Sequence, residues 1–209
     1  MRGPELSPAK RTGLFLAALF VFALAVRVAS YSFLVGGLSD PPPAKTDAVE
    51  YDLLARNVAD GIGFRYGSEH PPTAFRPPLY PLILASVYKV FGPSYLAARM
   101  LQFILSALAC CLVWRLAWVL TASRALAMTA SVIAVVYPSM FYHAGFLLTE
   151  SVYIFFLVLS CLACAEVEKN PSLKNQILAG VSLGLLCLVR SNAVFFAFFL
   201  FFWALAVFE

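Results

Sequence analysis

Two carboxylates could carry acid–base chemistry, and the first of them is Asp47. It opens a polar segment that follows a long apolar run. A carboxylate at a membrane boundary, beside apolar surface, can act as a general base. The spacing also fits a local role, because Asp47 and Glu50 could form a capping box at a helix start. The two roles are compatible, so Asp47 is a candidate catalytic base.

Glu150 is the second candidate. It closes the stretch Phe146–Glu150 and sits at the edge of another apolar run. Acids at the membrane edge are costly to place there, which favours a functional role. The alternative is a helix start, with Thr149 as the N-cap and Glu150 in the first turn, where the helix dipole favours an acid. The sequence leaves these two interpretations open.

Two arginines could hold an anion. Arg76 comes just before Pro77 and Pro78, which favour a helix start immediately after it. A guanidinium fork suits phosphate oxygens, and at a lipid surface the natural phosphate is a head group. Arg190 ends an apolar run and has the same potential. For both, the alternative is a side chain that reaches from the membrane surface into water. His70 and His143 have no partners at metal-ligand spacing, so we expect no tightly bound metal.

The elements that position these residues are apolar runs. The chain is 62% hydrophobic and 12% charged, against roughly 45–50% and 25% in a soluble domain. Six runs approach the roughly 20 residues that a membrane span needs. They are Gly13–Val35, Tyr95–Leu120, Ala125–Tyr142, Leu148–Ala165, Gln176–Val189 and Ala193–Phe208. We therefore expect an all-α integral membrane protein, residues 1–209 forming one multi-span domain, with an uncleaved first span in which Arg27 snorkels or faces protein.

The segment Gly36–Gly92 separates the first two spans and holds six of the chain's eleven acids. Within it, Asp47, Glu50, Tyr51, Leu54 and Val58 fall on one face of a helix. Gly61 and Gly63 supply the stop. This predicts an amphipathic helix over about Asp47–Asp60. Leu79–Phe91 is apolar but too short to span, so we expect it to be interfacial or re-entrant.

Lysine and arginine positions predict the orientation. They lie before the first span, around the end of the second and after the fourth, which predicts that these sites and the N-terminus are cytoplasmic. The loop 36–92 and the junction 138–150 then lie on the outer face, as does Arg190. The net charge of +4 is scattered along the chain, so no nucleic-acid patch is expected. The five cysteines all lie in apolar runs and predict no disulfide framework.

The order of these pieces resembles a known family. Asp47, Tyr51, the Gly61–Phe64 turn, the element Arg76–Leu79, and the later Glu150 and Arg190 occur in this order. The arrangement is similar to the N-terminal half of GT-C class glycosyltransferases that use polyprenyl-phosphate sugars, the relatives of protein mannosyltransferases and aminoarabinose transferases. Members often have Glu directly after the first Asp, whereas here Ala48 follows Asp47. They are also usually about twice as long.

The resemblance implies inverting transfer of a sugar from a polyprenyl-phosphate donor to a hydroxyl of a protein, lipid or glycan. It implies a GT-C-like bundle, no cofactor, and an active site on the outer face of a membrane, taken here as a bacterial plasma membrane. Asp47 would be the base, and Glu150 would orient the acceptor or help position Asp47. Arg76 would bind the phosphate, with Glu50, Tyr51 and Arg190 as further substrate-binding residues.

Two other functions remain as alternatives. A small transporter or flippase would line a pathway with Arg27, Glu150 and Arg190, but it predicts inverted repeats, and the polar loop occurs once. A subunit that binds donor lipid without catalysis is the third possibility. Replacement of Asp47 by Asn separates it from the enzyme, because only the enzyme would lose an activity.

Overall fold

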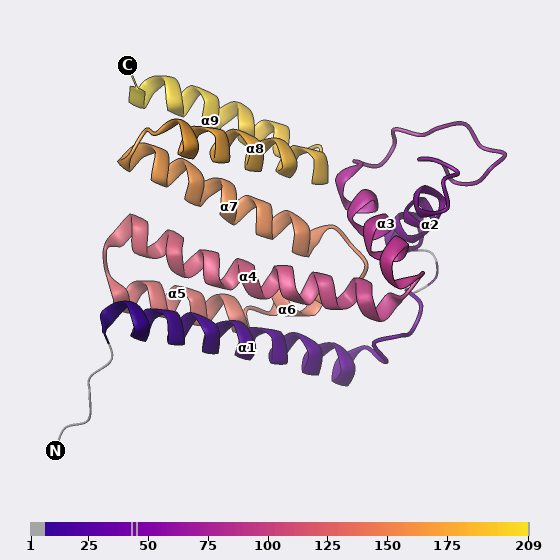
Figure 1. The fold of residues 1–209 in the computed structure, drawn as a ribbon, viewed down its shortest axis with the longest axis horizontal. Coiled ribbons are helices and arrows are strands. Elements are labelled where there is room, and N and C mark those ends of the chain that lie inside the picture. Colours follow the sequence, from indigo (N-terminus) through magenta and orange to yellow (C-terminus); the bar gives the residue numbers. More distant parts are fainter. Residues whose placement is uncertain (1–6, 43, 45, 209) are drawn as a thin grey trace.

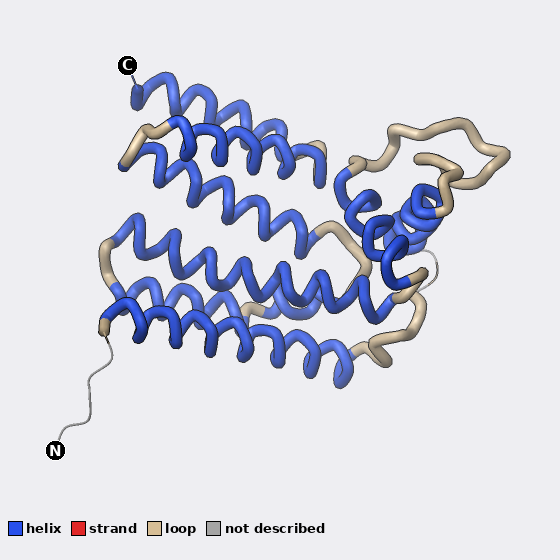
Figure 2. The backbone as a smooth tube through the Cα atoms, in the orientation of Figure 1, coloured by secondary structure: helices blue, strands red, loops and turns tan. Residues whose placement is uncertain are grey.

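The computed structural model describes residues 7–42, 44 and 46–208, and its described part is built from helices and loops (Figure 2). The predicted all-α class is therefore confirmed. The helices are α1 (Pro8–Leu34), α2 (Asp47–Ala59), α3 (Leu79–Phe91), α4 (Tyr95–Thr121), α5 (Arg124–Val136), α6 (Pro138–Tyr142), α7 (Glu150–Lys169), α8 (Leu173–Val189) and α9 (Ala193–Phe208), with a 3₁₀ turn, η1 (His143–Gly145), before α7.

The long helices run side by side as a bundle, and α2 and α3 lie beyond one end of it (Figure 1). We call α2, α3 and residues 60–78 between them the lobe. The opposite end carries the start of α1, the α4–α5 connection and the α7–α8 connection (Figure 1). We call it the basic end, because Arg115, Arg124, Lys169 and Lys174 lie there.

Three helices, α1, α4 and α7, are long and apolar enough to cross a membrane, and α5 with the segment after it makes a fourth if that bent pair is one span. The protein is therefore a multi-pass membrane protein. All six predicted runs are helical, but α8 and α9 have 17 and 16 residues, fewer than the roughly 20 that cross the hydrocarbon core.

The predicted run Ala125–Tyr142 is not one straight helix. It bends by 53° between α5 and α6. Pro138 has no N–H to donate and disfavours helical geometry at the residue before it. Tyr137 is accordingly extended, with φ −67° and ψ 117°. The prediction of a continuous element was wrong at this point, and the proline explains the break.

Arg27 faces protein rather than lipid or water. It is fully buried between α1 and α4. Its guanidinium donates to the Ser106 hydroxyl at 2.7 Å, to the Ala23 carbonyl at 3.0 Å and to the Cys110 sulfur at 3.1 Å. These bonds replace the water that a cation would otherwise need. Arg27 therefore fastens the first span to the second long helix and offers no free face to a transported solute.

Arg99 joins three separate segments just below the lobe. It is 1% exposed and donates to the carbonyls of Leu38 at 2.5 Å and Gly145 at 3.0 Å. Its guanidinium also lies 4.7 Å from the centre of the Tyr31 ring, a cation–π distance. The end of α1, the first loop and η1 are thereby held against α4.

Gly145 gives a test of this packing. A Cβ added at Gly145 would overlap the ring of Tyr31, which is itself buried. Overpacking of this kind lowers stability by about 1–3 kcal/mol, so we expect Gly145→Ala to lower the unfolding midpoint in detergent. Gly13→Ala is the matched control, because a Cβ there meets nothing within 4 Å and alanine favours a helix. Equal midpoints for the two variants would contradict the packing.

Candidate active site in the lobe

Asp47, Glu50 and Arg76 form one ion cluster. Arg76 donates two nearly parallel bonds to the Asp47 carboxylate, at 2.8 and 3.1 Å, and a third to Glu50 at 2.8 Å. The arginine side chain is 16% exposed, whereas those of Asp47 and Glu50 are 59% and 43% exposed. The guanidinium is thus the more buried group, and the two carboxylates that bind it lie further out at the rim of the lobe.

The geometry of α2 bears on the capping interpretation of Asp47. Thr46 is the N-cap residue and Asp47 is the first helical residue, so Asp47 and Glu50 do not form the alternative capping box. Their carboxylates instead bind Arg76, 29 and 26 residues away in the chain. Two acids in the first turn still favour the helix start through its dipole. The sequence therefore folds as an amphipathic helix whose first turn presents acids to the loop.

Residues 60–78 return Arg76 to the start of α2. The predicted stop is confirmed, because α2 ends at Ala59 and Gly61 and Gly63 have φ of +78° and +101°, values that favour glycine. Asn57, buried on α2, donates to the Arg65 carbonyl at 2.7 Å. Thr73 N–H bonds the Phe64 carbonyl. These contacts fold the loop back before Pro77 and Pro78 lead into α3.

Aromatic side chains support the ion cluster. The Arg76 guanidinium lies 5.2 Å from the centre of the Tyr51 ring, and Tyr51 packs edge-on against Tyr80 at 5.0 Å. The Tyr66 hydroxyl donates to Glu50 at 3.3 Å. Burial raises the pKa of Tyr51 and of Tyr66. Both phenols therefore remain protonated near neutral pH and can act as hydrogen-bond donors.

Arg76 itself stays charged. Burial alone would lower the pKa of Arg76, but the hydrogen bonds that Arg76 donates to Glu50 and Asp47 outweigh this and raise the pKa above its ordinary value. A guanidinium has five N–H donors, and the three bonds to carboxylates use three of them. The remaining donors leave Arg76 able to bind a further oxygen-rich anion without releasing Asp47.

Glu150 and Arg190 form a second ion pair, where α7 begins and α8 ends. Arg190 donates to Glu150 at 2.6 Å and to the Thr149 hydroxyl at 2.7 Å, and it lies over the Tyr153 ring. Thr149 is the N-cap residue, but its side chain makes no cap bond. A helix start alone therefore does not account for Thr149 and Glu150, because both side chains accept hydrogen bonds from Arg190.

The two ion clusters are separate but share a core. Tyr80, fully buried on α3, packs with Tyr51 above it and with Val152 and Val189 of the bundle. The Tyr80 hydroxyl and Glu150 Oε2 are both buried without a hydrogen-bond partner among the described residues. Orphaned polar atoms of this kind call for a water or a ligand group. The structure thus brings Asp47, Glu50, Tyr51 and Arg76 together, with Glu150 and Arg190 one layer below.

A cavity of about 480 Å³ opens beside Arg76. Its walls come from the loop of the lobe and from the ends of α8 and α9. They are Phe64, Thr73, Ala74, Arg76, Pro77, Pro78, Gly184, Cys187, Leu188, Ser191 and Val194. Arg76 is the charged residue in this lining, and most of the remaining surface is apolar. The cavity can therefore take an amphiphile with an anionic group.

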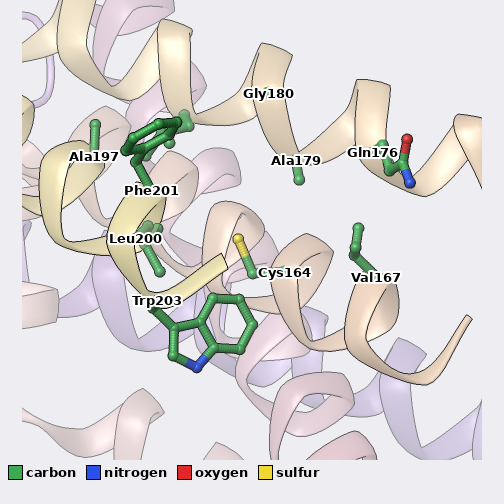
Figure 3. Close-up of a pocket in the computed structure, with 10 residues that line it drawn as sticks. Cys164, Val167, Gln176, Ala179, Gly180, Ala197, Leu200, Phe201 and Trp203 are labelled. Carbon is green, nitrogen blue, oxygen red and sulfur yellow. The ribbon is translucent and has the colours of Figure 1, made fainter. Parts of the chain in front are cut away.

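A second, apolar groove of about 350 Å³ follows α8 towards the basic end, between α7, α8 and α9. Figure 3 shows Cys164 from α7, Gln176 and Gly180 from α8, and Phe201 and Trp203 from α9 around it. Gly180 and Gln176 in the groove lie one and two turns before Gly184 in the cavity, on the same face of α8. One strip of α8 therefore lines both spaces.

Sequence reasoning missed a second polar network, which docks the lobe on the bundle. Asp52 is buried on α2 and accepts from Tyr88 at 2.6 Å, Arg56 at 2.9 Å and Tyr95 at 3.1 Å. The Asp52–Arg56 pair has the i, i+4 spacing of helix ion pairs, and that spacing was the available signal. Because its groups satisfy one another, we interpret this network as structural.

Replacement of Glu150 tests the second ion pair. Both partners are partly buried, so we expect Glu150→Gln to lower the free energy of unfolding by about 1 kcal/mol. Glu69→Gln is the matched control, since Glu69 is exposed and bonds its neighbour Ser68. A double-mutant cycle with Arg190→Gln should show a coupling energy of similar size. Additive effects in that cycle would contradict the pairing.

A bundle of apolar helices with a charged, cavity-bearing lobe at one end defines a multi-pass membrane protein with a candidate site at one end of its bundle. The sequence profile of the family described as dolichyl-phosphate-mannose-protein mannosyltransferase matches residues 75–208, more than half of the chain. The chain belongs to this family of GT-C type membrane glycosyltransferases. No curated protein and no solved structure matches it significantly. The matched part includes Arg76, Glu150 and Arg190, whereas Asp47 precedes it.

Proposed function

We propose that the protein transfers a sugar from a polyprenyl-phosphate donor to an acceptor hydroxyl, with the lobe as its active site. The observation that carries the proposal is the position of Arg76. It lies at a cavity with mostly apolar walls and is held there by two outward-facing carboxylates. A lipid-linked phosphate has both the anion and the apolar chain that this arrangement suits. The family membership supports glycosyl transfer as the reaction.

Asp47 is the proposed base. It would take the proton of the acceptor hydroxyl, whose oxygen attacks the anomeric carbon as the bond from that carbon to the phosphate oxygen breaks. The lipid phosphate leaves with the electron pair, and the anomeric centre is inverted. Because a phosphate is a good leaving group, a single base suffices, unlike glycoside hydrolysis with its acid and base pair. No step requires a metal, and we expect transfer to persist in EDTA.

Arg76 would stabilise the charge that develops on the departing phosphate. Its bonds to Asp47 keep the base and the phosphate-binding cation in one rigid unit, which favours in-line geometry. Glu50 accepts the hydrogen bond from Nε of Arg76. Tyr51 supports it from beneath. Glu150 and Arg190 lie one layer lower and would orient the acceptor or keep the Tyr51–Tyr80 layer in place.

The apolar strip on α8 suggests where the donor's tail lies. It leads from the cavity at Arg76 into the groove between α8 and α9. A prenyl chain laid along this strip would place the phosphate at Arg76 and the sugar towards the exposed carboxylates. In this position the phosphate and the sugar lie at the membrane–water boundary, and the prenyl tail lies in the hydrocarbon layer.

The test is transfer of radiolabelled sugar by the purified chain in nanodiscs. We expect product from a polyprenyl-phosphate sugar, with inverted anomeric configuration, and none from the corresponding nucleotide sugar. Product from the nucleotide sugar, or retained configuration, would overturn the proposal.

A non-catalytic, donor-binding role is the second candidate. The observation favouring it is that the family match begins at residue 75, so α2 and Asp47 lie outside the matched part. Such a subunit would bind the polyprenyl-phosphate sugar without consuming it. Donor binding with no product under the conditions above would support this candidate over the enzyme.

We also propose that the lobe lies on the outer face of a bacterial plasma membrane and the basic end in the cytoplasm, as the lysine and arginine positions favour. Ser68→Cys in the lobe and Lys174→Cys at the basic end place thiols at exposed positions. In intact cells, a membrane-impermeant maleimide should label the first and spare the second until the cells are opened. The reverse pattern would invert the orientation.

A further inference from the structure

A further cavity lies among residues of the basic end, which is the end of the bundle opposite the lobe. Its volume is about 440 Å³, and it is formed by the start of α1, the end of α4 and the start of α5. The lining residues are Ala9, Thr12, Trp114, Arg115, Trp118 and Arg124. Two arginines, a hydroxyl and two indoles therefore surround it, and no carboxylate belongs to its lining.

The tryptophans give this cavity a fixed wall. Trp114 and Trp118 stack with ring centres 5.9 Å apart and an interplanar angle of 6°. Trp114 is 6% exposed, and its indole N–H has no hydrogen-bond partner among the described residues. A buried donor without an acceptor is costly. A water or a ligand oxygen that reached the Trp114 indole would supply the missing acceptor.

The charge at the cavity is positive and only partly compensated. Arg115 is paired with Glu166 at 2.6 Å. Arg124 is exposed, and its side chain makes no hydrogen bond or ion pair within the part of the chain that the structure describes. An arginine with all its donors available, beside an indole N–H and a threonine hydroxyl, matches the several oxygens of a phosphate diester.

We propose that this cavity binds the phosphate of an anionic phospholipid of the same membrane. Met128 on α5, one turn after Arg124 and on the same face of the helix, is a large apolar residue exposed on the bundle surface. It offers an apolar contact for an acyl chain beside Arg124. The absence of a lining carboxylate disfavours the ammonium of a zwitterionic head group. A lipid bound there would contact α1, α4 and α5 together and would stabilise their packing.

The experiment compares phosphatidylglycerol with phosphatidylcholine. The full chain is purified from nanodiscs holding equal amounts of both, and the lipids it retains are counted by native mass spectrometry. We expect phosphatidylglycerol to be enriched about tenfold on the wild type, a factor of the size expected for charge-assisted bonds. Arg124→Ala and Trp114→Phe should reduce the enrichment. Lys174→Ala, which removes an exposed cation at the same end without touching the cavity, should leave it unchanged.

Two further measurements distinguish a specific lipid site from an effect of charge and from a site for free phosphate. Arg124→Lys retains the charge but not the fork, and we expect it to lose most of the enrichment while melting like the wild type. Equal enrichment in all variants would overturn the site. A loss in Lys174→Ala as large as that in Arg124→Ala would also overturn it, because the enrichment would then depend only on net charge. Displacement of the lipid by millimolar inorganic phosphate would show a free-anion site and overturn the assignment to a lipid.

Discussion

Asp47→Asn is expected to reduce the rate of sugar transfer by roughly 10²–10⁴-fold, the usual contribution of a general base. The asparagine has the shape of the aspartate and can still accept a bond from Arg76, but it cannot take a proton. Donor binding should therefore persist, and the loss should lie in kcat. The measurement is single-turnover transfer in nanodiscs, with donor affinity determined on the same samples.

Asp60→Asn is the matched control for this change. Asp60 caps the far end of α2 and is exposed, so the same chemical change is made on the same helix away from Arg76. We expect its transfer rate to equal that of the wild type. If Asp47→Asn retains full activity, Asp47 is not the base, and the adjacent Glu50 becomes the group to test.

Arg76→Ala should weaken donor binding and slow transfer together. The arginine makes three charge-assisted bonds to carboxylates and in the proposal binds the phosphate as well. Loss of one charged hydrogen bond to the donor corresponds to about 1.5–3 kcal/mol, or roughly 10- to 150-fold in affinity. Removing the guanidinium also leaves Asp47 and Glu50 repelling one another at the rim. Isothermal titration with the donor lipid and steady-state transfer would measure both losses.

Arg76→Lys separates charge from geometry. Lysine keeps the cation but cannot form the fork that joins Asp47 to a phosphate, so we expect intermediate binding and a transfer rate close to that of the alanine variant. Lys89→Ala, which removes an exposed cation from α3, should change neither. Donor affinity in Arg76→Ala equal to that of the wild type would remove the phosphate-binding role from this residue.

The helices of the lobe were predictable from local signals. The spacing of Tyr51, Leu54 and Val58 indicated α2, and Gly61 and Gly63 marked its end, because both signals act within one or two helical turns. The break at Tyr137 was equally local, and the apolar composition concealed it, since Pro138 lies within a run that reads as one span. The sequence therefore predicted where the helices lie, but it did not predict the break within one of them.

The partners of the site residues were not predictable in the same way. Arg76 meets Asp47 across 29 residues, and Arg190 meets Glu150 across 40. Such pairs depend on how α2 and α3 pack and on where α8 ends beside α7. The lysine and arginine positions predicted that these groups share one side of the membrane, but they did not show that Arg190, and not Arg76, pairs with Glu150. Asp52 was missed for the same reason, because its partners Tyr88 and Tyr95 come from other helices.

The central claim is that donor phosphate binds at Arg76 with its tail on α8. The direct measurement is photo-crosslinking with a polyprenyl phosphate that carries a diazirine on the prenyl unit next to the phosphate, followed by mass spectrometry of the labelled peptides. We predict labels within residues 64–78 and 184–194, reduced in Arg76→Ala and retained in Asp47→Asn. Labels confined to the basic end, or to α4 and α5, would contradict the account.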